Sequence, residues 1–203
     1  MRQAKVVFRA LMAQKNVTAG LYEYLSINKV PLDSSDLLRW QWVLSVSALD
    51  KYIHDIVAAG MVEQYLNRRA TTPKFNAFQL SMNVINNLAI APVPEIEFRN
   101  EVIRRNSYLA FQDPEKIADA LSYIWNEPNK WNVISGNMAT HIDPVTLKTK
   151  LKNIVVRRNQ IVHEGDCLST SIPLIQQPIS HSDTEDVIHF ITELVDAIDL
   201  SIV

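Results

Sequence analysis

Capping residues followed directly by proline recur along the sequence and divide it into segments. Three such pairs are Thr72-Pro73, Asp113-Pro114 and Asp143-Pro144. A threonine or aspartate at the N-cap, with proline at the first helical position, is a typical start of an α-helix. Most of the intervening segments carry apolar residues three and four positions apart, which places these residues on one helix face. The pattern predicts an all-α fold, and the length of 203 residues favours a single domain over residues 1–203.

Caps and apolar spacing also predict where individual helices lie. Long helices are expected over roughly residues 2–28, 35–68, 72–88 and 145–163. The first can break near Gly20, because glycine weakens a helix interior. In the second, a continuous apolar stripe is formed by Leu38, Trp42, Val46, Leu49, Ile53 and Ile56. A last helix, capped by Ser182 or Asp183, is expected to bury Val187, Ile191, Leu194, Val195 and Ile198.

Glycine is scarce and widely spaced. The chain has only four glycines, at positions 20, 60, 136 and 165. Phosphate-binding loops of the GxGxxG or GxxxxGK[ST] type need closely spaced glycines, so nucleotide-binding folds of these types are excluded. The formal net charge of −2 likewise excludes a broadly basic nucleic-acid-binding surface, so any such binding must be local.

The sequence favours a cytoplasmic protein that does not enter a membrane. The single cysteine, Cys167, cannot form an internal disulfide, so the fold does not depend on an oxidising compartment. The first residues lack the apolar run of a signal peptide, and no uncharged apolar stretch is long enough to span a bilayer.

Positive charge is concentrated in one predicted helix. No acidic residue interrupts the segment between Asp143 and Glu164, which carries Lys148, Lys150, Lys152, Arg157 and Arg158. Such a run is most often a solvated helix face, and a phosphate-binding surface is the alternative.

The basic run ends in residues 157–166, RRNQIVHEGD, in which an arginine is followed after four residues by a histidine. This motif resembles the signature of the HEPN superfamily, and the form RRNxIVHxGD is most similar to the RiboL-PSP-HEPN branch. Residues 47–54, SALDKYIH, and residues 113–118, DPEKIA, fit the same branch. The resemblance covers most of the chain from about residue 35 to the final helix.

Helix geometry places the motif residues on different faces. Arg158 shares its face with an apolar stripe of four residues, to within about 60°. These are Leu151, Ile154, Val155 and Val162. An unpaired buried charge is costly, so the guanidinium must meet a partner or lie at a seam between helices or subunits. Asn159 and His163 are only about 40° apart, whereas Arg158 and His163 are about 140° apart. Arg158 and His163 can therefore meet on one helix only if its final turn unwinds near Gly165, or if the long arginine side chain extends around the helix.

The residue types suit cleavage of RNA without a metal. A histidine can accept the proton of a ribose 2′-hydroxyl near neutral pH, and that oxygen then attacks the adjacent phosphate. An arginine stays protonated and donates two parallel hydrogen bonds to the developing phosphate charge. Gly165 can adopt a left-handed conformation, which predicts that the motif helix ends at residues 163–165.

The resemblance to HEPN ribonucleases implies a helical bundle with additional helices, a homodimer in which two motifs meet in one cleft, and cleavage of single-stranded RNA. It implies that Arg158 and His163 are catalytic, that Asn159 positions them, and that Asp50 and His54 support them from the second long helix. We further expect RNA contacts from Arg157 and Lys152, and neither metal nor cofactor. A role as a toxin or anti-phage defence effector, with an antitoxin or regulatory protein as partner, is also implied.

Other interpretations remain open at this point. The chain can be a non-catalytic HEPN-like dimerisation or RNA-binding module of a larger complex, or a regulatory nucleotide-binding helical bundle. His163 can be a charged helix C-cap. Asp50 and His54 can be an ordinary intrahelical pair, and Arg157 can be solvated.

Overall fold

The structure is a computed structural model that describes residues 2–168, 172–173 and 175–202. Within these residues the chain is helical, and its only β-type pairing is a bridge between Cys167 and Gln176, so the all-α prediction is confirmed. No helix of this part of the chain is long and apolar enough to cross a bilayer. The helices are α1 (Arg2–Ala13), α2 (Lys15–Ile27), α3 (Ser35–Tyr65), α4 (Pro73–Asn76), α5 (Met82–Ile90), α6 (Pro94–Asn106), α7 (Pro114–Leu121), α8 (Lys130–Asn137), α9 (Pro144–Glu164) and α10 (His181–Ser201).

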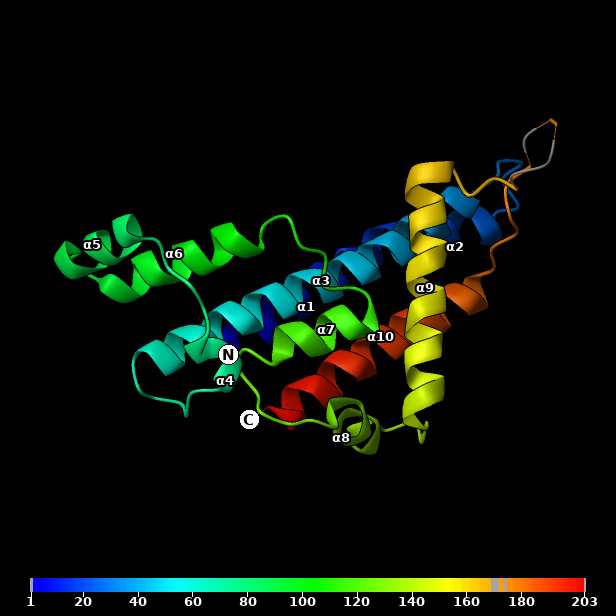
Figure 1. The fold of residues 1–203 in the computed structure, drawn as a ribbon. Coiled ribbons are helices and arrows are strands. Elements are labelled where there is room, and N and C mark those ends of the chain that lie inside the picture. The colour runs from blue at the N-terminus through cyan, green and yellow to red at the C-terminus, as the bar shows by residue number, and fades with distance from the viewer. Residues whose placement is uncertain (1, 169–171, 174, 203) are drawn as a thin grey trace.

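The long helix α3 forms the centre of the bundle. It packs against α1, α2, α6, α7, α9 and α10 (Figure 1). The predicted stripe of α3 is buried except for Trp42, which is half-buried, and the predicted apolar face of α10 is buried throughout. Apolar residues removed from water by α3 and α10 therefore supply much of the core, as the helical spacing predicted.

The predicted helix starts are confirmed where a cap precedes proline. Side chains of Thr72, Asp113 and Asp143 each accept a hydrogen bond from a backbone N–H in the first turn of α4, α7 and α9. The start of α10 differs from the prediction, because Ser180 rather than Ser182 or Asp183 is the N-cap. The Ser180 hydroxyl accepts a hydrogen bond from the Asp183 backbone N–H at 3.1 Å.

Two predicted helices are each divided in the structure. The first breaks at Gln14 rather than near Gly20, just after Met12, the last buried residue of α1. The predicted helix over residues 72–88 is instead the short α4 and the separate α5, with Ser81 capping α5. Between them, the ring of Phe78 packs edge-on against Phe98 of α6. The packing of Phe78 and the cap at Ser81 thus divide the segment that the sequence pattern predicted to be one helix.

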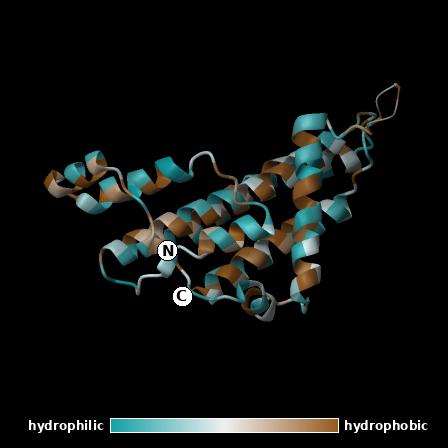
Figure 2. Ribbon diagram, viewed as in Figure 1, coloured by the Kyte–Doolittle hydropathy of each residue, from teal (hydrophilic) through white to brown (hydrophobic). Residues whose placement is uncertain are grey.

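Helix α9 stands steeply across α3 and α10 and projects beyond them at its C-terminal end (Figure 1). Hydrophobic and hydrophilic residues are interspersed along it in Figure 2, and the helical spacing gathers the apolar ones on one face. Its buried residues are Leu147, Leu151 and Ile154, so the core holds only its first half. The helix ends at Glu164, and Gly165 has a left-handed φ of 62°, which confirms the predicted termination.

Candidate active site

Arg157 is tied to the buried carboxylate of Asp166. Its Nε and Nη2 lie 2.8 Å from Oδ1 and Oδ2 of that carboxylate, which is completely buried. Its Nη1 also donates to Gln177 Oε1 at 3.2 Å. Arg157 is therefore not a freely solvated charge, because its guanidinium is paired within the chain; its expected contact with RNA stays a prediction.

A second arginine, Arg39 of α3, holds the same carboxylate. Arg39 is 6% exposed, and its Nε donates to Asp166 Oδ2 at 2.8 Å. Its Nη2 donates to the backbone carbonyl of Gln177 at 2.8 Å. Sequence reasoning missed Arg39, because it lies 127 positions from Asp166 and shows no motif of its own. We call Arg39, Arg157, Asp166 and Gln177 the Asp166 cluster.

Arg158 has a different environment from its neighbour. Its Nη1 donates to Asn159 Oδ1 at 3.0 Å, and its Nε is buried without a hydrogen-bond partner. No carboxylate of the described residues forms an ion pair with it. A half-buried guanidinium with donors left over can bind an anion that enters from outside the chain.

Asn159 and His163 lie on the open side of α9, one turn apart, and both are exposed. Because α9 remains helical through Glu164, Arg158 and His163 stay about 140° apart around its axis. The final turn does not unwind before the histidine. In one chain, therefore, the predicted catalytic pair faces two different directions.

Lys152 shares the exposed strip of Asn159 and His163. The three residues fall within about 40° of one another around α9, and about 10 to 17 Å of helix separates Lys152 from the other two. Among the basic-run lysines, Lys148 pairs with Glu115, and the ammonium of Lys150 lies over an aromatic ring. Lys152 is exposed and has no ion pair among the described residues.

Asp50 and His54 of α3 contact the segment that connects α6 to α7. The Asp50 carboxylate accepts a hydrogen bond from Phe111 N at 2.5 Å, and His54 Nε2 lies 3.2 Å from the carbonyl of Leu109. The His54 ring also packs on the ring of Phe111, with centroids 4.4 Å apart. In the described structure they therefore contact the connection between α6 and α7 and also each other, with His54 Nε2 3.9 Å from Asp50 Oδ1, as in the intrahelical pair left open by the sequence. Their expected role in orienting the motif stays a prediction.

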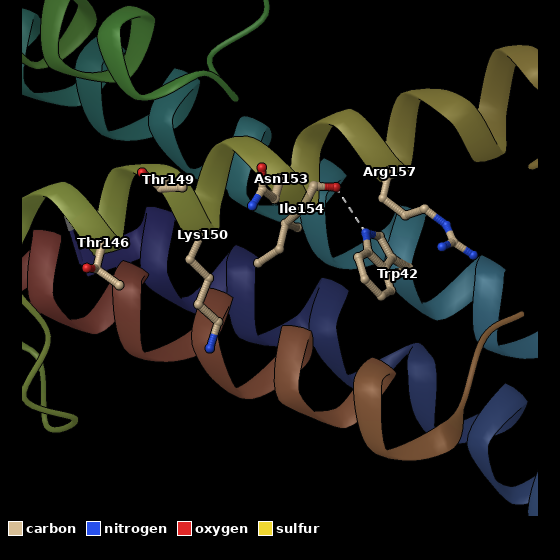
Figure 3. Close-up of a pocket in the computed structure, with 7 residues that line it drawn as sticks. All are labelled: Trp42, Thr146, Thr149, Lys150, Asn153, Ile154 and Arg157. Atoms are coloured by element: carbon tan, nitrogen blue, oxygen red, sulfur yellow. Dashed lines mark hydrogen bonds between the residues drawn. The ribbon is translucent and has the colours of Figure 1, made fainter. Parts of the chain in front are cut away.

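A groove of about 410 Å³ runs along another flank of α9 (Figure 3). It is lined by Trp42, Thr146, Thr149, Lys150, Asn153, Ile154 and Arg157. The indole of Trp42 donates to the Ile154 carbonyl at 3.1 Å, which fixes the ring against α9. The lining includes neither Arg158 nor His163, since Asn153 and Arg157 lie about 80 to 120° round the helix from the histidine. The candidate catalytic side chains therefore lie outside this groove.

No set of three or more histidine, cysteine, aspartate or glutamate side chains within the described residues is grouped so as to hold a metal ion. The predicted site residues Arg158, Asn159, His163 and Lys152 all lie on α9, with Arg158 on a different side of the helix from the other three. The Asp166 cluster lies on the side of α9 that faces the bundle.

Comparison with known proteins supplies the family. A search of curated proteins found no match, and a search of solved structures found none either. The family model described as RiboL-PSP-HEPN matches residues 15–203, which extend from the start of α2 to the end of the chain. That range contains the Arg158 to His163 motif, the central helix α3 and the closing helix α10. The chain therefore belongs to the RiboL-PSP-HEPN family.

Proposed function

We propose that this protein is a HEPN-type endoribonuclease that cleaves single-stranded RNA without a metal ion. Arg158 and His163 are the catalytic residues, and Asn159 positions the arginine through its side-chain hydrogen bond. The observation that carries the proposal is the difference between two adjacent arginines. Arg157 is neutralised by Asp166, whereas Arg158 keeps donors without a carboxylate partner beside two exposed polar residues.

The reaction needs one base and one cationic hydrogen-bond donor. The His163 imidazole takes the proton of a ribose 2′-hydroxyl, and the 2′ oxygen forms a bond to the adjacent phosphorus. The bond from phosphorus to the 5′ oxygen breaks, that oxygen takes a proton from solvent water, and the protonated His163 returns its proton to solvent. The products are a 2′,3′-cyclic phosphate and a 5′-hydroxyl. The Arg158 guanidinium stabilises the charge that develops on the phosphate oxygens.

Two copies of the chain complete the site in this proposal. The regular geometry of α9 separates Arg158 from His163 on one helix, so the facing helix of a second copy supplies the missing group. The flank beside Arg158 suits such a contact, because Val162 is 46% exposed although it continues the apolar stripe. Light-scattering mass at several dilutions tests this point, and a strict monomer at all concentrations contradicts a composite site.

Lys152 extends the surface along the RNA backbone. Its exposed ammonium lies on the same strip as Asn159 and His163, at a separation that one or two neighbouring phosphates can span. DNA is expected to bind this surface without being cut, because it lacks the 2′-hydroxyl that the reaction requires.

The cellular role follows only from the family resemblance. We propose a toxin or an anti-phage defence effector in the cytoplasm, restrained by an antitoxin or regulatory protein. The alternative function is RNA binding or dimerisation without cleavage, in which case the protein retains RNA but leaves it intact.

The test incubates purified full-length protein with single-stranded RNA in the presence of EDTA, alongside Arg158→Ala and His163→Ala. We expect cleavage by the wild-type protein and almost none by either variant. Intact RNA in all three samples contradicts a nuclease, and cleavage by both variants contradicts the assignment of the site.

A further inference from the structure

Polar contacts hold residues 157–164 of α9 to the bundle, beyond Val155, which still packs against the core. The helix buries no residue after Ile154, so the hydrophobic core does not fix the turns that carry the candidate catalytic groups. Arg157 is the residue of these turns that reaches into the protein, through the Asp166 cluster. We infer that Asp166 is a positioning residue: its cluster fixes the C-terminal turns of α9 and thereby places Asn159 and His163. The inference rests on the proposed function.

The Asp166 carboxylate joins three segments of the chain. Arg39 comes from the first turns of α3, and Arg157 comes from α9. Gln177 comes from the segment that returns to α10, and its carbonyl accepts hydrogen bonds from both guanidiniums, at 2.8 and 3.4 Å. A fully buried carboxylate is strongly destabilised unless its charge is paired. Movement of α9 away from α3 is therefore opposed by loss of that pairing.

The backbone of Asp166 takes part as well as its side chain. Gly165 and Asp166 both have left-handed φ values, of 62° and 58°. This conformation is uncommon for a residue other than glycine, although aspartate tolerates it better than most. The Asp166 N–H donates to the Gln160 carbonyl at 3.0 Å, and its carbonyl accepts from Gln177 N at 2.7 Å. The ion pairs thus hold the residue that closes the final turn of α9.

The cluster supports the proposed site without covering it. Arg157 lies about 120° round α9 from His163 and about 160° from Asn159. The anchored side therefore faces the bundle while the strip of Asn159 and His163 faces outward. A change in the cluster is expected to displace the catalytic groups without removing any group that contacts RNA. Such displacement lowers turnover more than it weakens binding.

The test compares Asp166→Asn with Glu101→Gln. Asparagine also tolerates the left-handed conformation but removes the charge that pairs with both arginines. Glu101 is a matched control, because it is a buried carboxylate held by two arginines, Arg104 and Arg105, within α6. Two measurements are made on each full-length variant: hydrogen–deuterium exchange by peptide, and kcat and KM on single-stranded RNA.

We expect Asp166→Asn to speed exchange in residues 156–166 and 175–178 while residues 144–154 keep the wild-type rate. We expect kcat to fall by up to about 10²-fold with KM within about twofold of wild type. Glu101→Gln should alter neither the exchange of α9 nor kcat. If Asp166→Asn does not fold, the double variant with Arg39→Met removes one unpaired buried charge. That variant should fold and still show low kcat.

Unchanged exchange in residues 156–166, or unchanged kcat in a folded Asp166 variant, overturns the inference. An equal loss of kcat in Glu101→Gln also overturns it, because the effect would not belong to this cluster. If the wild-type protein does not cleave RNA, the proposed function fails instead. The exchange measurement then decides by itself whether the cluster holds the turn.

Discussion

Arg157 and Arg158 are adjacent in sequence and about 100° apart around α9, and they meet opposite surroundings. Arg157 lies against a fully buried carboxylate and is one of two arginines that share it. Arg158 donates to the side chain of Asn159 and, unlike Arg157, forms no ion pair with a carboxylate of the described residues. The difference teaches that one residue of a basic pair can anchor a helix while the other is left for a ligand.

The largest effect is expected on the open side of α9. His163→Ala removes the proposed general base and should lower kcat by about 10² to 10⁴-fold. His189→Ala is the matched control, because that histidine is also exposed on a long helix, α10, away from the motif. It should leave cleavage unchanged. Equal activity of the His163 variant and the control in a single-turnover assay would remove the histidine from the mechanism.

Replacing each of the two arginines by alanine should have a different main effect. Arg158→Ala should lower kcat by about 10² to 10³-fold, because it removes a donor to developing phosphate charge, with little change in the free energy of unfolding. Arg157→Ala should instead lower that free energy by about 3 kcal/mol, because it leaves the buried Asp166 carboxylate with one arginine. Urea denaturation and RNA cleavage measure both quantities. If Arg157→Ala has the same free energy of unfolding as wild type, Arg157 does not anchor α9 as described.

A local cluster on α6 offers a comparison with the Asp166 cluster. Hydrogen bonds from Arg104, and further ones from Arg105, lower the pKa of Glu101 from its ordinary 4.5 to about 2. A lowered folded-state pKa contributes stability that is present above pH 4.5 and is lost as the pH falls towards 2. Glu101→Gln should therefore be less stable than wild type by about 1 to 3 kcal/mol at pH 7. The difference should fall steeply between pH 4.5 and pH 2, as thermal melts across this range can show. A difference independent of pH contradicts the ion-pair account.

The smallest effect concerns the exposed strip beyond the catalytic residues. Lys152→Ala should weaken RNA binding modestly and reduce the slope of log affinity against log salt by about 0.7, the value for one phosphate contact on a single strand. Turnover at saturating RNA should not change. Fluorescence anisotropy at several salt concentrations measures the slope, with Lys148→Ala as control because Lys148 already pairs with Glu115. If the slope for Lys152→Ala equals that of wild type, Lys152 does not contact an RNA phosphate.

Local signals in the sequence predicted the local features of the fold. Asp143 before Pro144 marked the start of α9, and Gly165 marked its end, because caps and left-handed turns depend on residues within a few positions. The apolar spacing of α3 and α10 predicted their buried faces for the same reason. The common face of Asn159 and His163 also followed from helix geometry, and the structure adds that both residues are exposed.

Contacts between distant segments could not be predicted in the same way. The pairing of Arg39 with Asp166 depends on how α3 and α9 cross, and no spacing in the sequence encodes that crossing. Asp50 and His54 were placed on the correct helix, but their partners come from the connection after α6. The pairing of Arg157 with Asp166 was not predicted, because one register on α9 decides whether a side chain faces the bundle or the solvent.

The most direct test of the proposed attack by the ribose 2′ oxygen compares two substrates. One is a single-stranded RNA, and the other is the same RNA with a single 2′-deoxy nucleotide at the position cut. Both are incubated with wild-type protein and EDTA, and the product ends are identified by mass. The account predicts that the RNA is cut to leave a 2′,3′-cyclic phosphate and that the deoxy substitution abolishes cleavage at that position. Two results would contradict this mechanism. One is cleavage of the substituted strand at the same position. The other is a product that ends in neither a 2′,3′-cyclic phosphate nor the 2′- or 3′-phosphate formed when that ring opens.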